Sequence, residues 1–360
     1  MKRIEFHDRE KEMKEITDIL DTEPSLITFV YGPINSGKTV LVRHLIEQLP
    51  EDYVVFYINL RTKFLASYDD FIESLFEMDM ETEKTRIKKE TLAELVSSAT
   101  KLAGIPITRE FLDYVFKDRK PKNAFAYIIK LFEEVKNAGK QPVLILDELQ
   151  KIGDVLVNGP LIYELFNFFI DLTKELHLAH VFAATSDSLF IESIYSEAML
   201  SERCKYLLVD DFDYEQTMDF LDVYGWGEHD KEIAWQGVGG KPVSLVRLIN
   251  EKRSEKKIED VIDSMLMLRT GEIETRLKLV KELGDEMRIG DKRCDVHHER
   301  LVSALKMFVT REEIGMNEVD EVSKRYLVKQ NILFVDPLSK TIKPQSKLNL
   351  LAVRDVMKDA

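Results

Sequence analysis

Short apolar runs alternate with helical stretches between residues 25 and 209 of the chain. The runs read as buried strands, because each is short, apolar and rich in β-branched or aromatic residues. They are Ser25–Tyr31, Asp52–Leu60, Pro142–Leu146, Ala179–Ala184 and Tyr206–Val209. Apolar residues with helical spacing cover Val40–Leu49, Asn123–Asn137 and Leu161–Leu176. Strands that alternate with helices in this way predict an α/β fold with a parallel sheet flanked by helices on both faces.

A different pattern follows Asp213, where helices succeed one another with no convincing strand before Ile332. These helices are predicted at Tyr214–Tyr224, Asp230–Gln236, Ser244–Arg253 and Ile258–Leu283. The charged segment Asp285–Lys292 contains Gly290 and reads as a linker. Three further helices, a strand at Ile332–Val335 and a strand at Thr341–Lys343 then follow, an order typical of a winged helix.

This pattern divides the chain into three parts. The sequence predicts a phosphate-binding core at 1–212 with a helical insertion at about 62–122, an all-α lid domain at 213–284 and a winged-helix domain at 293–360. No fixed-period repeat or low-complexity tract interrupts them.

The net charge of −14 is unevenly distributed. Residues 1–292 carry 39 basic and 55 acidic side chains, whereas residues 293–360 carry 12 and 10. The excess of acidic side chains in residues 1–292 argues against extensive binding to nucleic acid, which is itself negatively charged. It leaves open a DNA contact through the slightly basic C-terminal unit.

Composition and run length exclude several classes of protein. No apolar run approaches the ~20 residues of a membrane-spanning helix, and the N-terminus lacks the apolar segment of a signal peptide. Only two cysteines occur, Cys204 and Cys294, which excludes a disulfide framework and a cysteine-rich zinc site. We therefore expect a cytoplasmic protein with no membrane partner.

The strongest chemical signal is the phosphate loop Gly32-Pro33-Ile34-Asn35-Ser36-Gly37-Lys38-Thr39, which lies between a predicted strand and a predicted helix. Its glycines allow the backbone to wrap phosphates and to point N–H groups at them. Lys38 is expected to meet the β- and γ-phosphates, and Thr39 to ligate Mg²⁺. The loop and the first residue after it, Val40, therefore predict a nucleotide-binding site.

The second signal is the apolar strand Pro142–Leu146, which ends in Asp147 and Glu148. This is a Walker B pattern, in which two carboxylates reach the carboxyl edge of the sheet. Asp147 is expected to hold Mg²⁺, directly or through water, and Glu148 to polarise the attacking water. The strand Asp52–Leu60 between the Walker motifs, together with Glu148, indicates the branch of NTPases with an additional strand there.

Two further candidates lie near later strands. The strand Ala179–Ala184 is followed by Thr185 and Ser186, and a hydroxyl there is expected near the γ-phosphate, with Ser186 the better candidate. The alternative is that Ser186 or Asp187 caps the next helix. Arg203 is a candidate to stabilise phosphate charge in the same or a neighbouring subunit, and a solvated surface arginine is the alternative.

Several motifs occur in a specific order over roughly residues 1–255. They are Phe6-x-x-Arg9-x-x-Glu12, the phosphate loop, Leu146–Gln150, Thr185–Phe190, Val209–Phe212 and Gly239-Gly240-Lys241-Pro242. This order resembles the archaeal ATPase family of the STAND group of signalling NTPases, which is related to AAA+ proteins.

The resemblance implies that the nucleotide is ATP or ADP, that Phe6 and Arg9 lie beside the adenine, and that Pro242 contacts the base. It also implies that a helical lid is followed by a winged helix. The same residues also suit purely structural roles. Phe6 and Arg9 share helical spacing with Glu12, and Pro242 fits the first position of a helix.

Charged residues outside the Walker motifs are ambiguous. Asp210 and Asp211 are expected to cap the helix that follows rather than to bind a metal. The candidate recognition helix of the winged-helix domain is Met316–Gln330. Three acidic residues crowd its N-terminal half, the end that usually meets bases, which favours a protein-interaction role over DNA binding. These residues are Glu318, Asp320 and Glu321.

The sequence as a whole predicts an ATP-binding, slowly hydrolysing molecular switch in which the nucleotide state repositions the lid and the winged helix. Its expected partners are ATP with Mg²⁺ and either another protein or a second copy of the chain. Two alternatives are a DNA-associated regulator with ATP-gated winged-helix binding and a nucleotide-binding scaffold with little turnover.

Overall fold

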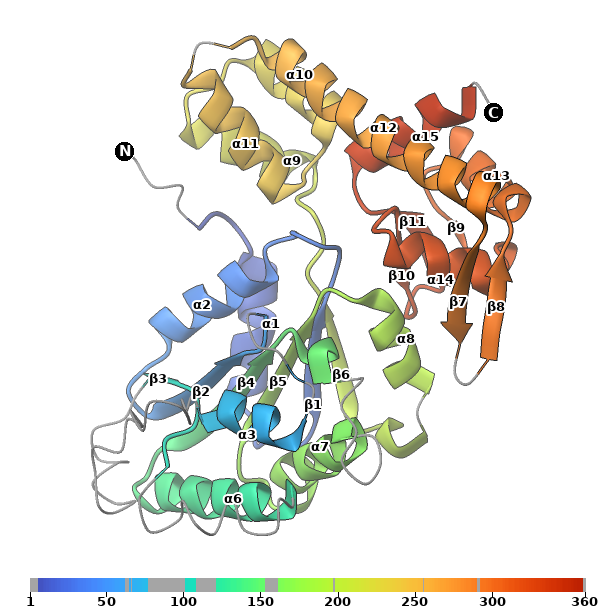
Figure 1. Cartoon of the computed structure of the whole chain (residues 1–360). Coiled ribbons are helices and arrows are strands. Elements are labelled where there is room, and N and C mark those ends of the chain that lie inside the picture. The colour runs from blue at the N-terminus through green and yellow to red at the C-terminus, as the bar shows by residue number, and fades with distance from the viewer. Residues whose placement is uncertain are drawn as a thin grey trace.

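A parallel six-stranded sheet forms the centre of the N-terminal part (Figure 1). The computed structural model describes residues 6–61, 65, 67–76, 101–107, 121–152, 161–196, 198–254, 256–289 and 292–358. The strand order is β3-β2-β4-β5-β1-β6, and every pair is parallel. The strands are β1 (Ile27–Tyr31), β2 (Tyr53–Asn59), β3 (Lys101–Ala103), β4 (Gln141–Asp147), β5 (His180–Thr185) and β6 (Cys204–Leu208).

Alternating side chains divide the sheet into two apolar faces. Phe29 and Phe56 point into one cluster, which includes buried residues of four α-helices, whereas Val30 and Val55 point into the other. The helices of the first cluster are α3 (Tyr68–Phe76), α6 (Pro121–Asn137), α7 (Leu161–Ile170) and α8 (Ser188–Ser196). The helices of the second face are α1 (Glu10–Leu20) and α2 (Lys38–Gln48). A sheet buried on both sides explains why its strands read as continuous apolar runs.

The five strands that the sequence predicts are confirmed, and β3 is an additional edge strand. β3 lies inside the predicted helical insertion at 62–122, of which α3 and the short segment 104–107 are also described. The rest of that prediction lies outside the described residues. The predicted helix Leu161–Leu176 is α7 followed by a π-helical segment at Asp171–Glu175.

The helices after the sheet pack on one another at the top of Figure 1. They are α9 (Tyr214–Val223), α10 (Glu228–Val238), α11 (Pro242–Lys252) and α12 (Ile258–Leu283). Asp213, not Asp210 or Asp211, caps α9 by accepting a hydrogen bond from the Gln216 N–H. The predicted caps are therefore wrong, because the position directly before α9 is Asp213 and both earlier carboxylates pair with lysines.

The C-terminal part is a small domain of helices and antiparallel strands. Its three-stranded sheet has the order β10-β11-β9, formed by β9 (Ile314–Gly315), β10 (Leu333–Asp336) and β11 (Thr341–Pro344). Its helices are α13 (His298–Lys306), α14 (Glu321–Lys329) and α15 (Lys347–Lys358). This arrangement of helices and a β-hairpin is the predicted winged helix. The long helix α12 joins it to the lid, since its first half packs in the lid cluster and its second half in the C-terminal cluster.

The predicted linker Asp285–Lys292 is wrong, since its described residues belong to the hairpin of β7 (Asp285–Ile289) and β8 (Lys292–Val296). Only Met287 and Val296 of this hairpin are buried, and they join the C-terminal cluster. The charged residues of β7 and β8 are exposed, which explains why this ribbon reads as a linker.

The winged helix packs against the N-terminal core through helix α8 (Ser188–Ser196) and strand β10. Each side contributes a residue to the other's core: Phe334 of β10 lies in a core cluster of the large sheet, and Leu189 of α8 lies in the C-terminal cluster. Lys324 Nζ lies 2.6 Å from Glu192 Oε1, and the Tyr31 hydroxyl donates to Asp336 Oδ1 at 2.8 Å. The two parts therefore share apolar and polar contacts across this boundary. No helix among the described residues is long and apolar enough to cross a membrane.

The turn before α11 packs closely against Phe212, and this close approach can be tested. A Cβ at Gly240 would lie 1.8 Å from the Phe212 carbonyl oxygen, whereas a Cβ at Gly271 in α12 would meet nothing within 4 Å. We expect Gly240→Ala to lower the free energy of unfolding by about 2 kcal/mol or more through overpacking. Gly271→Ala, the matched control, should raise it by about 0.5–1 kcal/mol. Denaturant titration of both full-length variants measures these changes, and equal effects would contradict the close approach at Gly240.

Candidate active site

The phosphate loop lies between β1 and α2, as its motif predicts. A Cβ at Gly32 would lie 2.1 Å from the Val209 carbonyl oxygen, so only glycine permits the loop to pass the end of β6. Gly37 has φ 99° at the N-cap of α2, a conformation that favours glycine. The first N–H groups of α2 have no partner within the helix and face the loop, which makes this helix end suited to phosphate.

Lys38 is buried under the loop and bonded to it. Its Nζ donates to the carbonyl oxygens of Gly32 (3.0 Å) and Pro33 (2.8 Å) and to Ser36 Oγ (3.3 Å). Burial, reinforced by the positive charge of Lys241, lowers the pKa of Lys38 to about 7, although the carboxylates of the site act in the opposite direction. This ammonium is therefore readily neutralised and in need of a negative partner.

Thr39 and Asp147 form the pair expected to hold Mg²⁺. The Thr39 hydroxyl donates to Asp147 Oδ2 at 2.8 Å, and the Tyr57 hydroxyl donates to the same oxygen at 3.1 Å. Burial and the nearby Asp147 charge raise the pKa of Tyr57 to about 12, so Tyr57 remains a donor. An oxygen-rich pair beside a phosphate loop fits the ligand preference of Mg²⁺. Tyr57 thereby holds in place the carboxylate that is predicted to bind the metal.

Glu148 follows Asp147 at the carboxyl edge of the sheet and has an unusual backbone conformation. Its φ is 64°, which a non-glycine residue adopts only when its surroundings impose it. Its Oε2 accepts a 2.6 Å hydrogen bond from Gln150 Nε2, and its Oε1 lies 3.5 Å from Arg61 Nε. The predicted catalytic carboxylate thus lies beside Asp147, with a hydrogen-bond donor at Oε2 and the Arg61 guanidinium near Oε1.

Thr185, one of the two candidates for the sensor position, contacts the segment that follows the Walker B strand. Thr185 is buried at the end of β5, in register with Tyr31 just before the phosphate loop. Its hydroxyl donates to Gln150 Oε1 at 2.7 Å, and Gln150 in turn contacts Glu148. The Thr185 hydroxyl thus reaches the Walker B segment, and the predicted place of Ser186 near the γ-phosphate stays a prediction. Asp187 caps α8, since its Oδ1 accepts from the N–H of Leu189.

Arg203 lies at the amino ends of the strands, whereas the phosphate loop lies at their carboxyl ends. Its carbonyl accepts from the N–H of Ile27, at the start of β1, whereas the phosphate loop follows the end of that strand. Its guanidinium donates to the Met199 carbonyl. A catalytic role within the same subunit is therefore wrong, because the length of β1 separates the two groups. A role toward a neighbouring subunit stays a prediction.

The N-terminal segment reaches the loop from the other side. Arg9 donates to the carbonyl oxygens of Ser36 (2.8 Å) and Asp210 (2.7 Å) and to Glu12 (2.8 Å). These contacts make Arg9 a support for the loop, so that its predicted contact with adenine must compete with them. Phe6 stacks on His44 of α2, with ring centroids 3.8 Å apart, and its proximity to a base stays a prediction.

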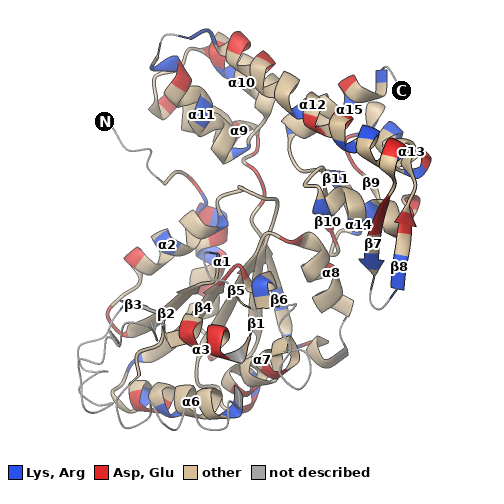
Figure 2. Ribbon diagram, in the orientation of Figure 1, with Lys and Arg blue, Asp and Glu red and all other residues tan. Residues whose placement is uncertain are grey.

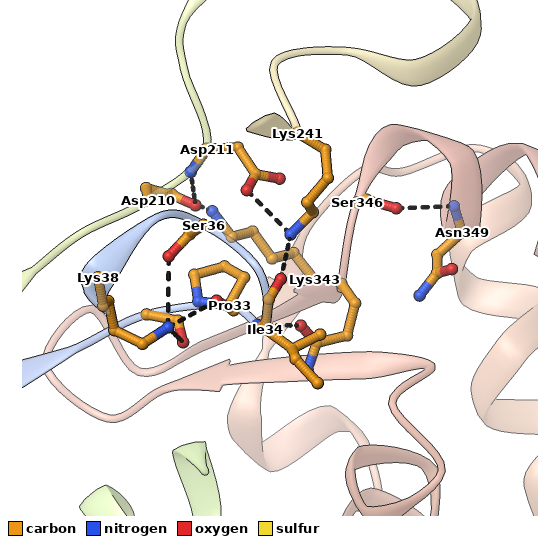
Figure 3. Close-up of polar contacts among 12 residues, drawn as sticks. Pro33, Ile34, Ser36, Lys38, Asp210, Asp211, Lys241, Lys343, Ser346 and Asn349 are labelled. Atoms are coloured by element: carbon orange, nitrogen blue, oxygen red, sulfur yellow. Dashed lines mark hydrogen bonds and ion pairs between the residues drawn. The ribbon is translucent and has the colours of Figure 1, made fainter. Parts of the chain in front are cut away.

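Both the lid and the winged helix bond Ile34, in the middle of the loop (Figure 3). Lys241, directly before Pro242 in the lid, donates from its Nζ to the Ile34 carbonyl at 3.0 Å. Gln345 of the winged helix accepts from the Ile34 N–H at 3.1 Å through its Oε1. Pro242 begins α11 and thereby sets where Lys241 lies, whereas its contact with a base stays a prediction.

Two ion pairs lie beside this junction. Asp211 Oδ1 lies 2.9 Å from Lys241 Nζ, and Asp210 pairs with Lys343 of β11. Burial raises the pKa of Asp211 and lowers the pKa of Lys241, so each group is displaced toward its neutral form despite the other. A pair in which lost hydration outweighs attraction is sensitive to any movement that admits water.

The sequence comparisons agree with this geometry. Residues 6–248 match the family model described as an ATPase domain predominantly from Archaea. The chain belongs to this archaeal ATPase family. Residues 259–357 match a second model, described as the C-terminal domain of uncharacterized MJ1010-like ATP-binding proteins. The resemblance to the archaeal ATPase family, inferred from the motif order, is confirmed.

Archaeal proteins described as ATP-binding are similar to this chain over nearly its whole length. An uncharacterized ATP-binding protein of Pyrococcus abyssi is 46% identical over 353 residues, covering 98% of this chain and 99% of the relative. One from Methanocaldococcus jannaschii is 44% identical over 363 residues, covering 98% of each. The solved structure of a Walker-type ATPase of Pyrococcus abyssi has a TM-score of 0.66 at 17% identity, covering 98% of this chain and 97% of that one. That structure shares the fold.

The sequence singles out neither Tyr57 nor Gln150 nor Gln345 of this site, and it indicates no contact for Lys241. Tyr57 offers a weak signal, a hydroxyl near the end of a predicted strand. Gln150 and Lys241 lie inside motifs that the family resemblance uses, which marks them without indicating their contacts. Gln345 offers no local signal, since 311 positions separate it from Ile34.

The lowered pKa of Lys38 predicts how ATP affinity depends on pH. Because Lys38 loses its proton near pH 7 and phosphates favour the ammonium form, binding takes up a proton and weakens as the pH rises. We expect the Kd for ATP to increase about fivefold between pH 7 and pH 8, as a group with a pKa near 7 requires. Calorimetric titration measures it. Lys38→Arg is the control, since a guanidinium does not titrate there; equal pH dependence in both would contradict this origin.

Proposed function

We propose that this chain is an ATP-binding, slowly hydrolysing molecular switch whose nucleotide state repositions the lid and the winged helix. The observation that carries the proposal is the double contact at Ile34, whose carbonyl is bonded to Lys241 of the lid and whose N–H is bonded to Gln345 of the winged helix. A rearrangement of the phosphate loop that moves Ile34 would therefore alter the bond from the lid and the bond from the winged helix together.

The groups that line the site are suited to a nucleotide with Mg²⁺. Lys38 and the N-terminus of α2 supply positive charge for phosphates, and Thr39 with Asp147 would hold the metal. Mg²⁺, when bound, neutralises charge that develops on the phosphate oxygens. Glu148 lies next to this pair, in the position to orient and polarise the attacking water.

Lys38 links occupation of the site to movement of the loop. Its ammonium is bonded to the loop carbonyls of Gly32 and Pro33, and these bonds compete with bonds to phosphate. A loop that rearranges to release Lys38 alters the neighbouring Ile34, and therefore the bonds from the lid and the winged helix. Each such hydrogen bond contributes about 0.5–1.5 kcal/mol, enough for a graded coupling.

The contacts of the winged helix favour a regulatory role over DNA binding. Lys324 of the candidate recognition helix α14 is buried between Glu192 and Glu321, and Lys343 is paired with Asp210. Figure 2 shows acidic and basic residues interspersed along α12, α13 and the β7–β8 hairpin. A released winged helix would expose these lysines to another protein or to a second copy of the chain.

The two Walker B carboxylates give the test of catalysis. Asp147→Asn should weaken binding of ATP with Mg²⁺ and lower turnover together, because Asp147 acts through the metal. Glu148→Gln should retain ATP while lowering turnover about 100-fold or more, the contribution of a positioned base. Calorimetry and phosphate release on both variants measure this. A Glu148→Gln variant that turns over ATP at the parent rate would favour the scaffold alternative.

The contact from the winged helix gives the test of switching. Gln345→Ala removes the acceptor for the Ile34 N–H, so the loop is freer to rearrange around phosphate. We expect ATP to bind about three- to tenfold more tightly, the equivalent of one hydrogen bond. Lys347→Ala is the control, since its ammonium pairs with Glu312 and not with the loop. An unchanged or weaker affinity in Gln345→Ala alone would contradict the coupling.

A further inference from the structure

A line of hydrogen bonds leads from Glu148 to the helix on which the winged helix rests. Gln150 Nε2 donates to Glu148 Oε2 at 2.6 Å, and Gln150 Oε1 accepts from the Thr185 hydroxyl at 2.7 Å. The Thr185 oxygen then accepts from the N–H of Asp187 at 3.1 Å. Asp187 is the residue before α8, and its carboxylate accepts from the N–H groups of Leu189 and Phe190.

The winged helix contacts this same first part of α8. The N–H of Val335 in β10 donates to Ser188 Oγ at 3.3 Å in a buried position. One turn further along α8, Glu192 Oε1 lies 2.6 Å from the buried Lys324 ammonium. A shift of the winged helix is therefore transmitted to the N-terminal turn of α8, directly beside Asp187.

Glu148 is restrained at the other end of the line. Its two carboxylate oxygens face Gln150 at 2.6 Å and Arg61 at 3.5 Å. Its φ of 64° also lies in the left-handed region, which indicates that neighbouring contacts hold the backbone there. A carboxylate held by a hydrogen bond at one oxygen and paired with a cation at the other is less free to turn toward an attacking water than an unrestrained one.

We propose that Gln150 is a positioning residue that restrains Glu148 while the winged helix is docked on α8, and that undocking releases Glu148 through Thr185 and Asp187. This inference rests on the proposed ATPase function and assigns its regulation. Chains of hydrogen bonds of this kind carry coupling when an element at one end has two arrangements, which here is the docked or undocked winged helix.

The first experiment measures ATP turnover by the full-length chain at saturating ATP. Gln150→Leu keeps the size of the side chain and removes its amide, so kcat should rise about tenfold with the Kd for ATP unchanged. Lys324→Met, which loosens the winged helix from α8, should also raise kcat. The double variant should show no further increase, because both changes release the same restraint. Glu192→Gln is the milder alternative to Lys324→Met.

The second experiment needs no ATPase activity. Hydrogen exchange of the nucleotide-free chain follows the amides of residues 187–190. We expect exchange at least about threefold faster in Thr185→Val, in Gln150→Leu and in Lys324→Met, because each removes part of the line. Thr185→Ser keeps the hydroxyl and should return exchange toward the parent rate. Ser193→Ala, an exposed position on α8, is the control with no change.

The outcomes separate the two proposals. A kcat that falls in Gln150→Leu, or that rises additively with Lys324→Met, overturns the inference while leaving ATP hydrolysis in place. Faster exchange without any turnover in the parent supports the line of contacts and removes hydrolysis from the proposed function. Exchange that does not change in Gln150→Leu and Thr185→Val overturns the inference whatever the turnover.

Discussion

The phosphate loop imposes one constraint on the whole chain: its buried polar groups must find partners. Buried backbone N–H and carbonyl groups are costly when they are left unpaired. Lys38 pairs with Gly32 and Pro33, Arg9 with Ser36, and Ile34 with Lys241 and Gln345. The N-terminal segment, the lid and the winged helix each supply a partner, so the arrangement of all three depends on the conformation of this loop.

Apolar packing makes these polar contacts possible. Phe334 of the winged helix packs in the apolar cluster of the large sheet, and Leu189 of α8 packs in the C-terminal cluster. Both side chains are buried. Exclusion of water strengthens the hydrogen bonds nearby, because a lower local dielectric favours a made bond and penalises a broken one. The same packing that docks the winged helix therefore maintains the polar line from α8 to Glu148.

Charged side chains are buried where the phosphate loop meets the lid and the winged helix, and their burial costs hydration free energy. Lys38, Lys241 and Asp211 are all displaced toward their neutral forms by burial. Such groups favour a state in which phosphate or water reaches them. The docked arrangement is thus stabilised by packing and opposed by desolvation, a balance suited to a switch with two accessible states.

The sequence by itself determined the α/β core and its two Walker motifs, because periodicity and short-range spacing encode strands, helices and the phosphate loop. It also indicated the lid and the winged helix. It misplaced the cap at Asp210 and Asp211 and the linker at Asp285–Lys292, since a charged segment reads alike as a turn, a linker or the exposed face of a hairpin.

Only the tertiary structure decided which distant groups meet. It brought Thr185 to Gln150, placed Arg203 at the amino ends of the strands, and joined Gln345 to Ile34 across 311 positions. Strand direction explains the second result. The third has no local cause, because the contact depends on how the winged helix packs on α8, which no pattern within either segment records.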